Sequence, residues 1–79
     1  KAIVYPNPFK EQATIKISNN KNVIYTLKLY NDLGQKVKTI SNISGTQIRI
    51  NRGNLKSGVY FFQILYGGKT YTEGRLMIN

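Results

Sequence analysis

The sequence predicts an all-β domain, a small sandwich or barrel of about seven short strands. Apolar and polar residues alternate with a period of two along most of the chain, which is typical of strands with one buried and one wet face. Turn-forming segments interrupt these runs at intervals of roughly 8–12 residues, as in small sandwiches. Apolar residues do not recur at helical spacing over any long window.

The first element is a restricted segment, Tyr5-Pro6-Asn7-Pro8-Phe9. Each proline fixes φ near about −65°, lacks a backbone donor and pushes the residue before it into the extended region. Because such a segment cannot lie in the middle of a sheet, we expect a rigid lead-in at a sheet edge. Tyr5 and Phe9 are expected to be its apolar anchors.

The next two strands are predicted on either side of the polar segment Asn19-Asn20-Lys21-Asn22. The earlier strand covers residues 14–18, with isoleucines at every second position. The later strand covers residues 23–30. Its apolar face carries Tyr25, Leu27 and Leu29, and Thr26, Lys28 and Tyr30 lie on the other face.

A tight hairpin is predicted at Asn31-Asp32-Leu33-Gly34. Gly34 supplies the positive φ that a short hairpin needs. The strand that follows centres on Val37, an apolar residue between two lysines, so we expect the Val37 side chain on the apolar face.

Three further strands complete the pattern. Ile48 and Ile50 alternate with polar residues over 47–51, and Tyr60, Phe62 and Ile64 share a face over 60–65. In the last strand Leu76 and Ile78 lie on one face, opposite Arg75 and Met77. The corners between these strands are predicted at Ser44-Gly45, Arg52-Gly53-Asn54, Ser57-Gly58 and Gly67-Gly68.

The composition excludes most chemistry. The chain has 79 residues, which is one small domain, with no cysteine, no histidine and only three carboxylates. Disulfides, thiolate metal sites and a histidine general base are therefore impossible. We expect no enzyme activity and no catalytic, metal or cofactor-binding residue. No apolar stretch approaches the about 20 residues of a membrane-spanning helix, and the start at Lys1, without a signal peptide, indicates a fragment of a longer protein.

The net charge of +9 raises the question of a polyanionic partner. A second explanation for the positive charge is a general bias of the composition toward lysine, asparagine and isoleucine, without a functional meaning of the charge. Exposed aromatic residues among the lysines would suit single-stranded nucleic acid, and the four candidates are Tyr30, Phe61, Tyr66 and Tyr71. Tyr25, Tyr60 and Phe62 instead lie in phase with the aliphatic core positions. We therefore expect no nucleic-acid partner.

Four segments in this order resemble the type A C-terminal sorting domain of proteins exported by the type IX secretion system of Bacteroidetes. They are Tyr5-Pro6-Asn7-Pro8-Phe9 with Thr14-Ile15-Lys16-Ile17, then Leu29 to Val37, then Leu55-Lys56-Ser57-Gly58-Val59-Tyr60, and finally Gly74-Arg75-Leu76-Met77-Ile78. The likeness covers essentially the whole chain. Its motif residues are Tyr5, Pro6, Asn7, Pro8, Phe9, Asp32, Gly34, Leu55, Gly58, Tyr60, Gly74, Arg75, Leu76, Met77 and Ile78. Many members of the family end in lysine or arginine, whereas here Arg75 is the last cation.

The resemblance implies an immunoglobulin-like sandwich of about seven antiparallel strands at the C-terminus of a secreted protein. It implies recognition in the periplasm, passage of a passenger through the outer-membrane translocon, and removal of the domain by a cell-surface sortase at a point near or before Lys1. The passenger would then be anchored to anionic lipopolysaccharide or released.

Structural roles are expected for several motif residues. Gly58 allows a sharp turn that brings Tyr60 into the core, and Leu55 plugs an open end of the sandwich. For recognition, residues 74–79 with the edge near 5–9 are expected to offer unpaired backbone groups for strand addition by the translocation machinery. The other interpretation is that the last strand only completes the sheet.

A basic surface on the wet strand faces is expected to meet lipopolysaccharide or an acidic translocon groove. Its residues are Lys16, Lys28, Lys36, Lys38 and Arg49. Two other functions remain open from the residues: a polyanion- or carbohydrate-binding accessory module, and a structural spacer in an adhesin.

Overall fold

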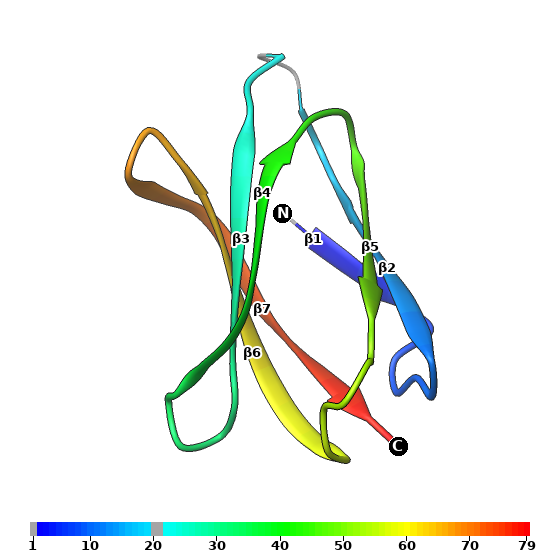
Figure 1. Ribbon diagram of the computed structural model, residues 1–79. Coiled ribbons are helices and arrows are strands. Elements are labelled where there is room, and N and C mark those ends of the chain that lie inside the picture. Colours follow the sequence, from blue (N-terminus) through cyan, green and yellow to red (C-terminus); the bar gives the residue numbers. More distant parts are fainter. Residues whose placement is uncertain (1, 20–21) are drawn as a thin grey trace.

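The computed structural model describes residues 2–19 and 22–79 as a two-layered β-sandwich (Figure 1). Lys1, and Asn20 and Lys21 of a predicted turn, lie outside the described residues. The strands are β1 (Ala2–Tyr5), β2 (Gln12–Ile17), β3 (Tyr25–Tyr30), β4 (Lys36–Ile43), β5 (Gln47–Asn51), β6 (Gly58–Tyr66) and β7 (Lys69–Ile78). The all-β prediction is confirmed, and of the two open architectures the structure has the sandwich. The described part contains no helix long and apolar enough to cross a membrane.

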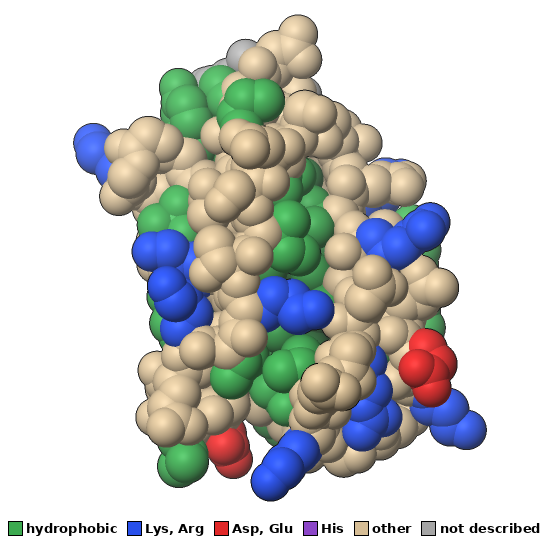
Figure 2. Space-filling model, viewed as in Figure 1, with side chains coloured by type: hydrophobic (Ala, Val, Ile, Leu, Met, Phe, Trp, Pro, Cys, Tyr) green, Lys and Arg blue, Asp and Glu red, His purple; other side chains and the backbone are tan. Residues whose placement is uncertain are grey.

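The strands form a three-stranded sheet, in the order β1-β2-β5, and a four-stranded sheet, in the order β4-β3-β6-β7. All strand pairs are antiparallel. In the constant-type immunoglobulin domain the fourth strand extends the sheet of the first two. Here β4 pairs with β3 instead, so the edges β4 and β5 face each other across one open side. Figure 2 shows apolar side chains in the space between those two edges.

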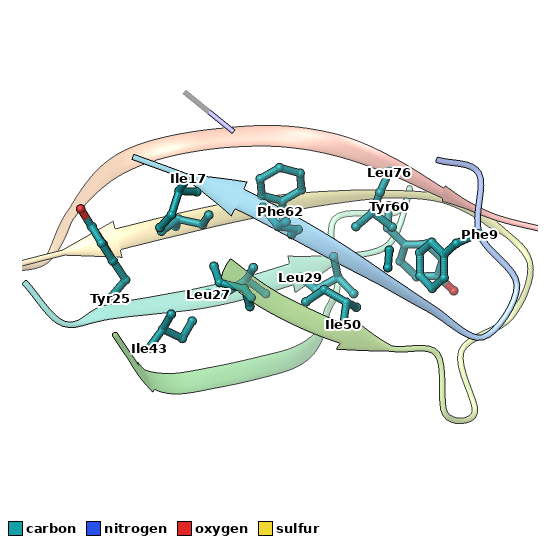
Figure 3. Packing of buried hydrophobic residues seen from close by; sticks show 14 of the residues in the cluster. Phe9, Ile17, Tyr25, Leu27, Leu29, Ile43, Ile50, Tyr60, Phe62 and Leu76 are labelled. Atoms are coloured by element: carbon teal, nitrogen blue, oxygen red, sulfur yellow. The ribbon is translucent and has the colours of Figure 1, made fainter. Parts of the chain in front are cut away.

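The core comes from the predicted alternation. On β3, Tyr25, Leu27 and Leu29 are buried, and the residues between them are half-buried on the outer face. Every side chain that is buried among the described residues is apolar. Figure 3 shows Phe9, Tyr60 and Leu76 at one end of this cluster and Tyr25 and Ile43 at the other. Leu55 packs, half-buried, against the same cluster, which agrees with its predicted role as a plug.

Only one of the two expected anchors of the opening segment is buried. Phe9 is 1% exposed, whereas Tyr5 is 45% exposed. The reason is strand parity: Ala2 and Val4 of β1 point inward, so Tyr5 points outward with Ile3. The prediction that Tyr5 anchors the segment in the core is wrong.

The expectation for Val37 is also wrong. A register shift separates the pairs Leu29–Lys38 and Tyr30–Lys36, which leaves Val37 as the extra residue of a bulge, with an exposed side chain. Lys38 consequently shares the inner face with Leu29, and its Nζ donates to the carbonyl oxygen of Asn51 on β5 at 2.8 Å. Lys38 therefore does not belong to a wet strand face.

The end of the sandwich that carries Tyr25 holds a tyrosine cluster. The ring centroids of Tyr25 and Tyr71 are 5.0 Å apart, those of Tyr25 and Tyr66 are 6.2 Å apart, and the Tyr71 hydroxyl donates to the carbonyl oxygen of Ser18. Burial first, and the neighbouring Tyr71 next, raise the pKa of Tyr25 above the ordinary tyrosine value. The partly exposed Tyr66 and Tyr71 are thus members of a packed cluster.

Candidate recognition surface

All four motif segments meet at the opposite end of the sandwich, which we call the motif end. It comprises residues 5–11, the β3–β4 turn at 31–35, the β5–β6 loop at 52–58 and the last residues of β7, at 74–79 (Figure 1). The chain reaches this end at four separate points of the sequence. The structure therefore brings together residues that are up to 70 positions apart, such as Asn7 and Met77.

The first motif covers the outer edge of β7. Phe9 N–H donates to the Met77 carbonyl oxygen at 3.0 Å, and Asn79 N–H donates to the Phe9 carbonyl oxygen at 2.8 Å. The Asn7 side chain takes the place of a strand residue: its Oδ1 accepts from Met77 N–H at 2.9 Å, and its Nδ2 donates to the Arg75 carbonyl oxygen at 3.4 Å. The peptide bonds before Pro6 and Pro8 are cis.

These bonds overturn one expectation. The backbone of residues 74–79, with the edge near residues 5–9, was predicted to offer unpaired groups for strand addition. Instead, β6 pairs with one side of this strand, and Asn7 and Phe9 bond to the other. The sequence did not reveal this because the partner segment lies at the far end of the chain and uses a side-chain amide.

The second motif is a turn held by Asn31. Asn31 Oδ1 accepts from the N–H groups of Leu33 and Gln35 at 3.0 and 2.9 Å, as asparagine does in Asx-turns. Gly34 has a φ of +81°, which confirms the prediction. Asp32 and Leu33 are exposed at the tip, and Leu33 is 79% exposed.

The third motif is a tyrosine corner. Tyr60 is buried, and its hydroxyl donates to the Lys56 carbonyl oxygen, four residues upstream, at 2.6 Å. This is the back-bond seen at the corner of immunoglobulin-like sandwiches. Gly58 has a φ of +150°, a region that is essentially restricted to glycine. Its predicted role, to turn the chain so that Tyr60 enters the core, agrees with this geometry.

The fourth motif depends on a close approach. Gly74 pairs with Phe62 of β6. A Cβ atom on Gly74 would lie 2.6 Å from Phe62 Cζ and 2.9 Å from Phe62 Cε2. Leu76 and Ile78 are buried, and Arg75 and Met77 are exposed on the outer face, as the alternation predicted.

Arg52 organises the motif end, although its sequence context predicts only a place in a turn. Its Nη1 donates to the Asn79 carbonyl oxygen at 2.7 Å, its Nε to the Leu55 carbonyl oxygen at 2.9 Å and its Nη2 to Ser57 Oγ at 3.1 Å. A longer contact of 3.4 Å joins Nη1 to the Lys10 carbonyl oxygen. No local sequence pattern indicates that Arg52 joins these segments, because its acceptors come from three separate parts of the chain.

We expect Arg52→Lys to lower the free energy of unfolding by about 1–2 kcal/mol. Lysine keeps the positive charge, but its single ammonium group cannot replace the planar guanidinium group, whose three nitrogen atoms donate to acceptors in different directions. Urea denaturation of the purified domain measures the effect. Arg49→Lys is the matched control, because Arg49 on β5 is exposed and its side chain donates no hydrogen bond to residues 2–19 or 22–79, so this substitution should change stability by less than about 0.5 kcal/mol. Equal effects of the two substitutions would contradict the role of Arg52.

Two shallow hollows lie on either side of Val59 at the motif end. One, of about 170 Å³, is lined by Asn7, Pro8, Val59, Arg75, Leu76 and Met77. The other, of about 190 Å³, is lined by Asn31, Asp32 and residues 56–60. The first hollow is therefore built from the first, third and fourth motifs and the second from the second and third motifs, and Val59 belongs to both hollows.

The charge at this end is mainly positive. The cations are Lys10, Arg52, Lys56 and Arg75, with Lys36 directly after the β3–β4 turn, and the acidic residues are Glu11 and Asp32. Within residues 2–19 and 22–79, no three acidic, histidine or cysteine residues lie close enough together to hold a metal ion. The arrangement suits the binding of another macromolecule at a surface with small apolar hollows and basic groups.

Comparison with protein families gives a match over nearly all of the chain. The model of a family described as "Secretion system C-terminal sorting domain" matches residues 3–79, which is essentially the whole chain. No curated protein matches the sequence.

Proposed function

Because the chain belongs to the family of secretion system C-terminal sorting domains, we propose that it directs a passenger protein across the outer membrane through the type IX secretion system. The family is a sorting-signal family and not an enzyme family. Such a signal implies delivery to the cell surface or the extracellular space. The match over residues 3–79 is the observation that carries the proposal.

The proposal has finer parts. The domain is the last unit of a longer secreted protein, it is recognised in the periplasm, and a sortase then removes it at a position upstream. The passenger is anchored to anionic lipopolysaccharide or released. The predicted basic residues do not form one surface, because Lys16 and Arg49 face outward on the three-stranded sheet and Lys28 and Lys36 on the four-stranded sheet. Lys28 and Lys36, which share their sheet face with Arg75, support a transient contact with lipopolysaccharide during transit.

Within the motifs, exposure separates two kinds of residue. Phe9, Tyr60, Leu76 and Ile78 are buried, so their first role is to hold the sandwich together. Arg75 and Met77 are exposed on the outer face, and Asp32 is exposed at a turn in which Asn31 makes the side-chain bonds. We assign recognition at the motif end to these three exposed residues.

The test is export of a fusion. Residues 1–79 are joined to the C-terminus of a reporter with a signal peptide, in a bacterium that has the type IX system and in a matched strain that lacks the translocon. We expect the reporter outside the cell only in the first strain, shortened by about the 9.0 kDa of the domain.

A tail of the same length with the sequence scrambled is the negative control. Retention of the fusion in the periplasm, with the domain folded, would overturn the sorting role. The assays for binding of polyanions and glycans would then come next, with salt dependence as the discriminator, because binding driven by phosphate charge weakens steeply as salt rises.

A further inference from the structure

The outer face of the four-stranded sheet carries a patch that neither the core nor the motif contacts use. Strand register places Lys36 beside Tyr30, Tyr30 beside Phe61, and Phe61 beside Arg75, in one row across all four strands. The next row toward the motif end pairs Val59 with Met77. We call this set the outer-face patch: Tyr30, Lys36, Val59, Phe61, Arg75 and Met77.

Side chains on one face of such a sheet stand about 4.5–5.5 Å apart at their Cβ atoms when they are direct cross-strand partners. The six residues therefore form a continuous surface. Phe61 is 45% exposed and Met77 is 43% exposed. The patch continues into the hollow of about 170 Å³ between Val59, Met77, Arg75 and Pro8, so it combines a flat apolar area with a place for one inserted side chain.

Charge defines what fits this surface. The row Lys36–Tyr30–Phe61–Arg75 has a cation at each end and no acid within it. Two acidic residues lie beside the patch: Glu73, in the neighbouring row that also contains Lys28 and Gln63, and Asp32, in the hollow on the other side of Val59. An apolar centre between two cations is complementary to an apolar side chain between two carboxylates.

We propose that the outer-face patch docks a protein partner in the export machinery, through a segment in which apolar and acidic side chains alternate. This inference rests on the proposed sorting function and names the chemistry of its partner. In this complex an apolar side chain of the partner segment packs on Phe61 and Met77 or enters the hollow beside Pro8. The carboxylates of the partner segment pair with Arg75 and Lys36.

Two other occupants fit less well. A single-stranded nucleic acid needs several open rings for successive bases, whereas here Tyr30 is half-buried and its hydroxyl bonds to Gln63 Oε1 at 3.3 Å, which leaves Phe61 as the one well-exposed ring of the patch. A second copy of this chain would bring equal patches together, and each carries Lys36 and Arg75 in a chain with a net charge of +9. Repulsion between like charges opposes that pairing.

The first measurement is export of the reporter fusion with two substitutions in the patch, Phe61→Thr and Arg75→Glu. Threonine suits an exposed strand position, and the bond from Asn7 to Arg75 goes to the backbone carbonyl oxygen, which the substitution keeps. We expect export to fall by about tenfold or more, the size of effect produced by losing one central contact and one charge pair. The melting temperature of the purified domain should stay close to that of the wild type.

The matched control lies on the outer face of the other sheet. Ile3→Thr with Arg49→Glu makes the same chemical changes at exposed positions of β1 and β5, and should leave export unchanged. Arg75→Lys, with Phe61 intact, should retain most of the export. If the patch variant is folded and exported like the wild type, the patch is not the docking surface, although the sorting function stands.

A second measurement does not depend on export. The ¹⁵N-labelled domain is titrated with the acetylated and amidated peptide Glu-Leu-Glu-Leu-Glu and with its glutamine analogue. We expect amide shifts confined to the patch for the acidic peptide and none for the neutral one. Such shifts in a domain that fails to sort its passenger would uphold the patch chemistry and overturn the proposed function.

Three results of the titration would overturn the inference. They are equal shifts with both peptides, shifts of the acidic peptide on the basic face of β2 and β5 instead of the patch, and no shifts at all. Patch shifts caused by oligo-dT, or by raising the concentration of the domain itself, would assign the surface to nucleic acid or to a second copy.

Discussion

Phe9→Ala should lower the free energy of unfolding by about 3–5 kcal/mol, the usual cost of deleting a buried aromatic side chain. Phe9 is 1% exposed and lies at the motif end of the core. Its backbone also forms two of the bonds that cover the outer edge of β7. Because a domain of this size has a total stability of only about 5 kcal/mol or somewhat more, the variant should be largely unfolded at 37 °C.

Urea denaturation followed by circular dichroism measures this effect. Phe9→Leu provides a graded variant, with an expected loss of about 1–1.5 kcal/mol, in case the alanine variant is too unstable for a full curve. Tyr5→Ala is the control from the same motif, because Tyr5 is 45% exposed, and should cost less than about 1 kcal/mol. Similar losses at Tyr5 and Phe9 would contradict the packing described for this segment.

The difference between Tyr5 and Phe9 shows what a sequence pattern can and cannot predict. On β3 the alternation from Tyr25 to Tyr30 predicts the buried residues correctly, because in a regular strand the side-chain period and the burial period are the same. The phase of β1 is different. Its inward-facing residues are Ala2 and Val4, so Tyr5, although it is the largest side chain of the strand, points to solvent.

Val37 shows a second limit. A single bulge reverses the phase of a strand, and the alternation of Lys36, Val37 and Lys38 contains no sign of it. The bulge exposes Val37 and turns Lys38 toward the open side between β4 and β5, where its ammonium group reaches a carbonyl group of the other sheet. The cause lies in the pairing with β3, which the local sequence does not encode.

The candidate site was predictable in part. The motif segments were identified by their resemblance to a family, and several carry local signals, such as two prolines, an Asn-Asp-Leu-Gly turn and a glycine two residues before a tyrosine. Their meeting at one end of the sandwich, and the bonds from Arg52 to the other segments there, depend on topology. The same holds for the outer-face patch, whose residues come from four strands and become neighbours only through strand register.

Gly74→Ala should destabilise the domain by about 1–3 kcal/mol, the usual cost of overpacking a core. The added Cβ would lie 2.6 Å from Phe62 Cζ, and Phe62 is only 2% exposed, so its ring has no free space into which it can move. Gly74→Val should exceed this loss and leave little folded protein. Chemical denaturation of each variant provides the measurement, and export of the fusion should fall in proportion to the unfolded fraction.

A double-mutant cycle with Phe62→Leu separates this contact from a general intolerance of substitution at Gly74. The shorter side chain gives the new methyl group room, so the two changes together should cost less than the sum of the single losses, by about 0.5–3 kcal/mol. Gly45→Ala is the control: Gly45 has a φ of +83° and no atom within 4 Å of an added Cβ, so its cost is backbone strain. That cost should add to the loss from Phe62→Leu without coupling. Additive losses at Gly74 and Phe62 would show that the glycine is needed for a reason other than the ring beside it, whereas coupling confined to this pair would assign the glycine of the fourth motif to packing against β6.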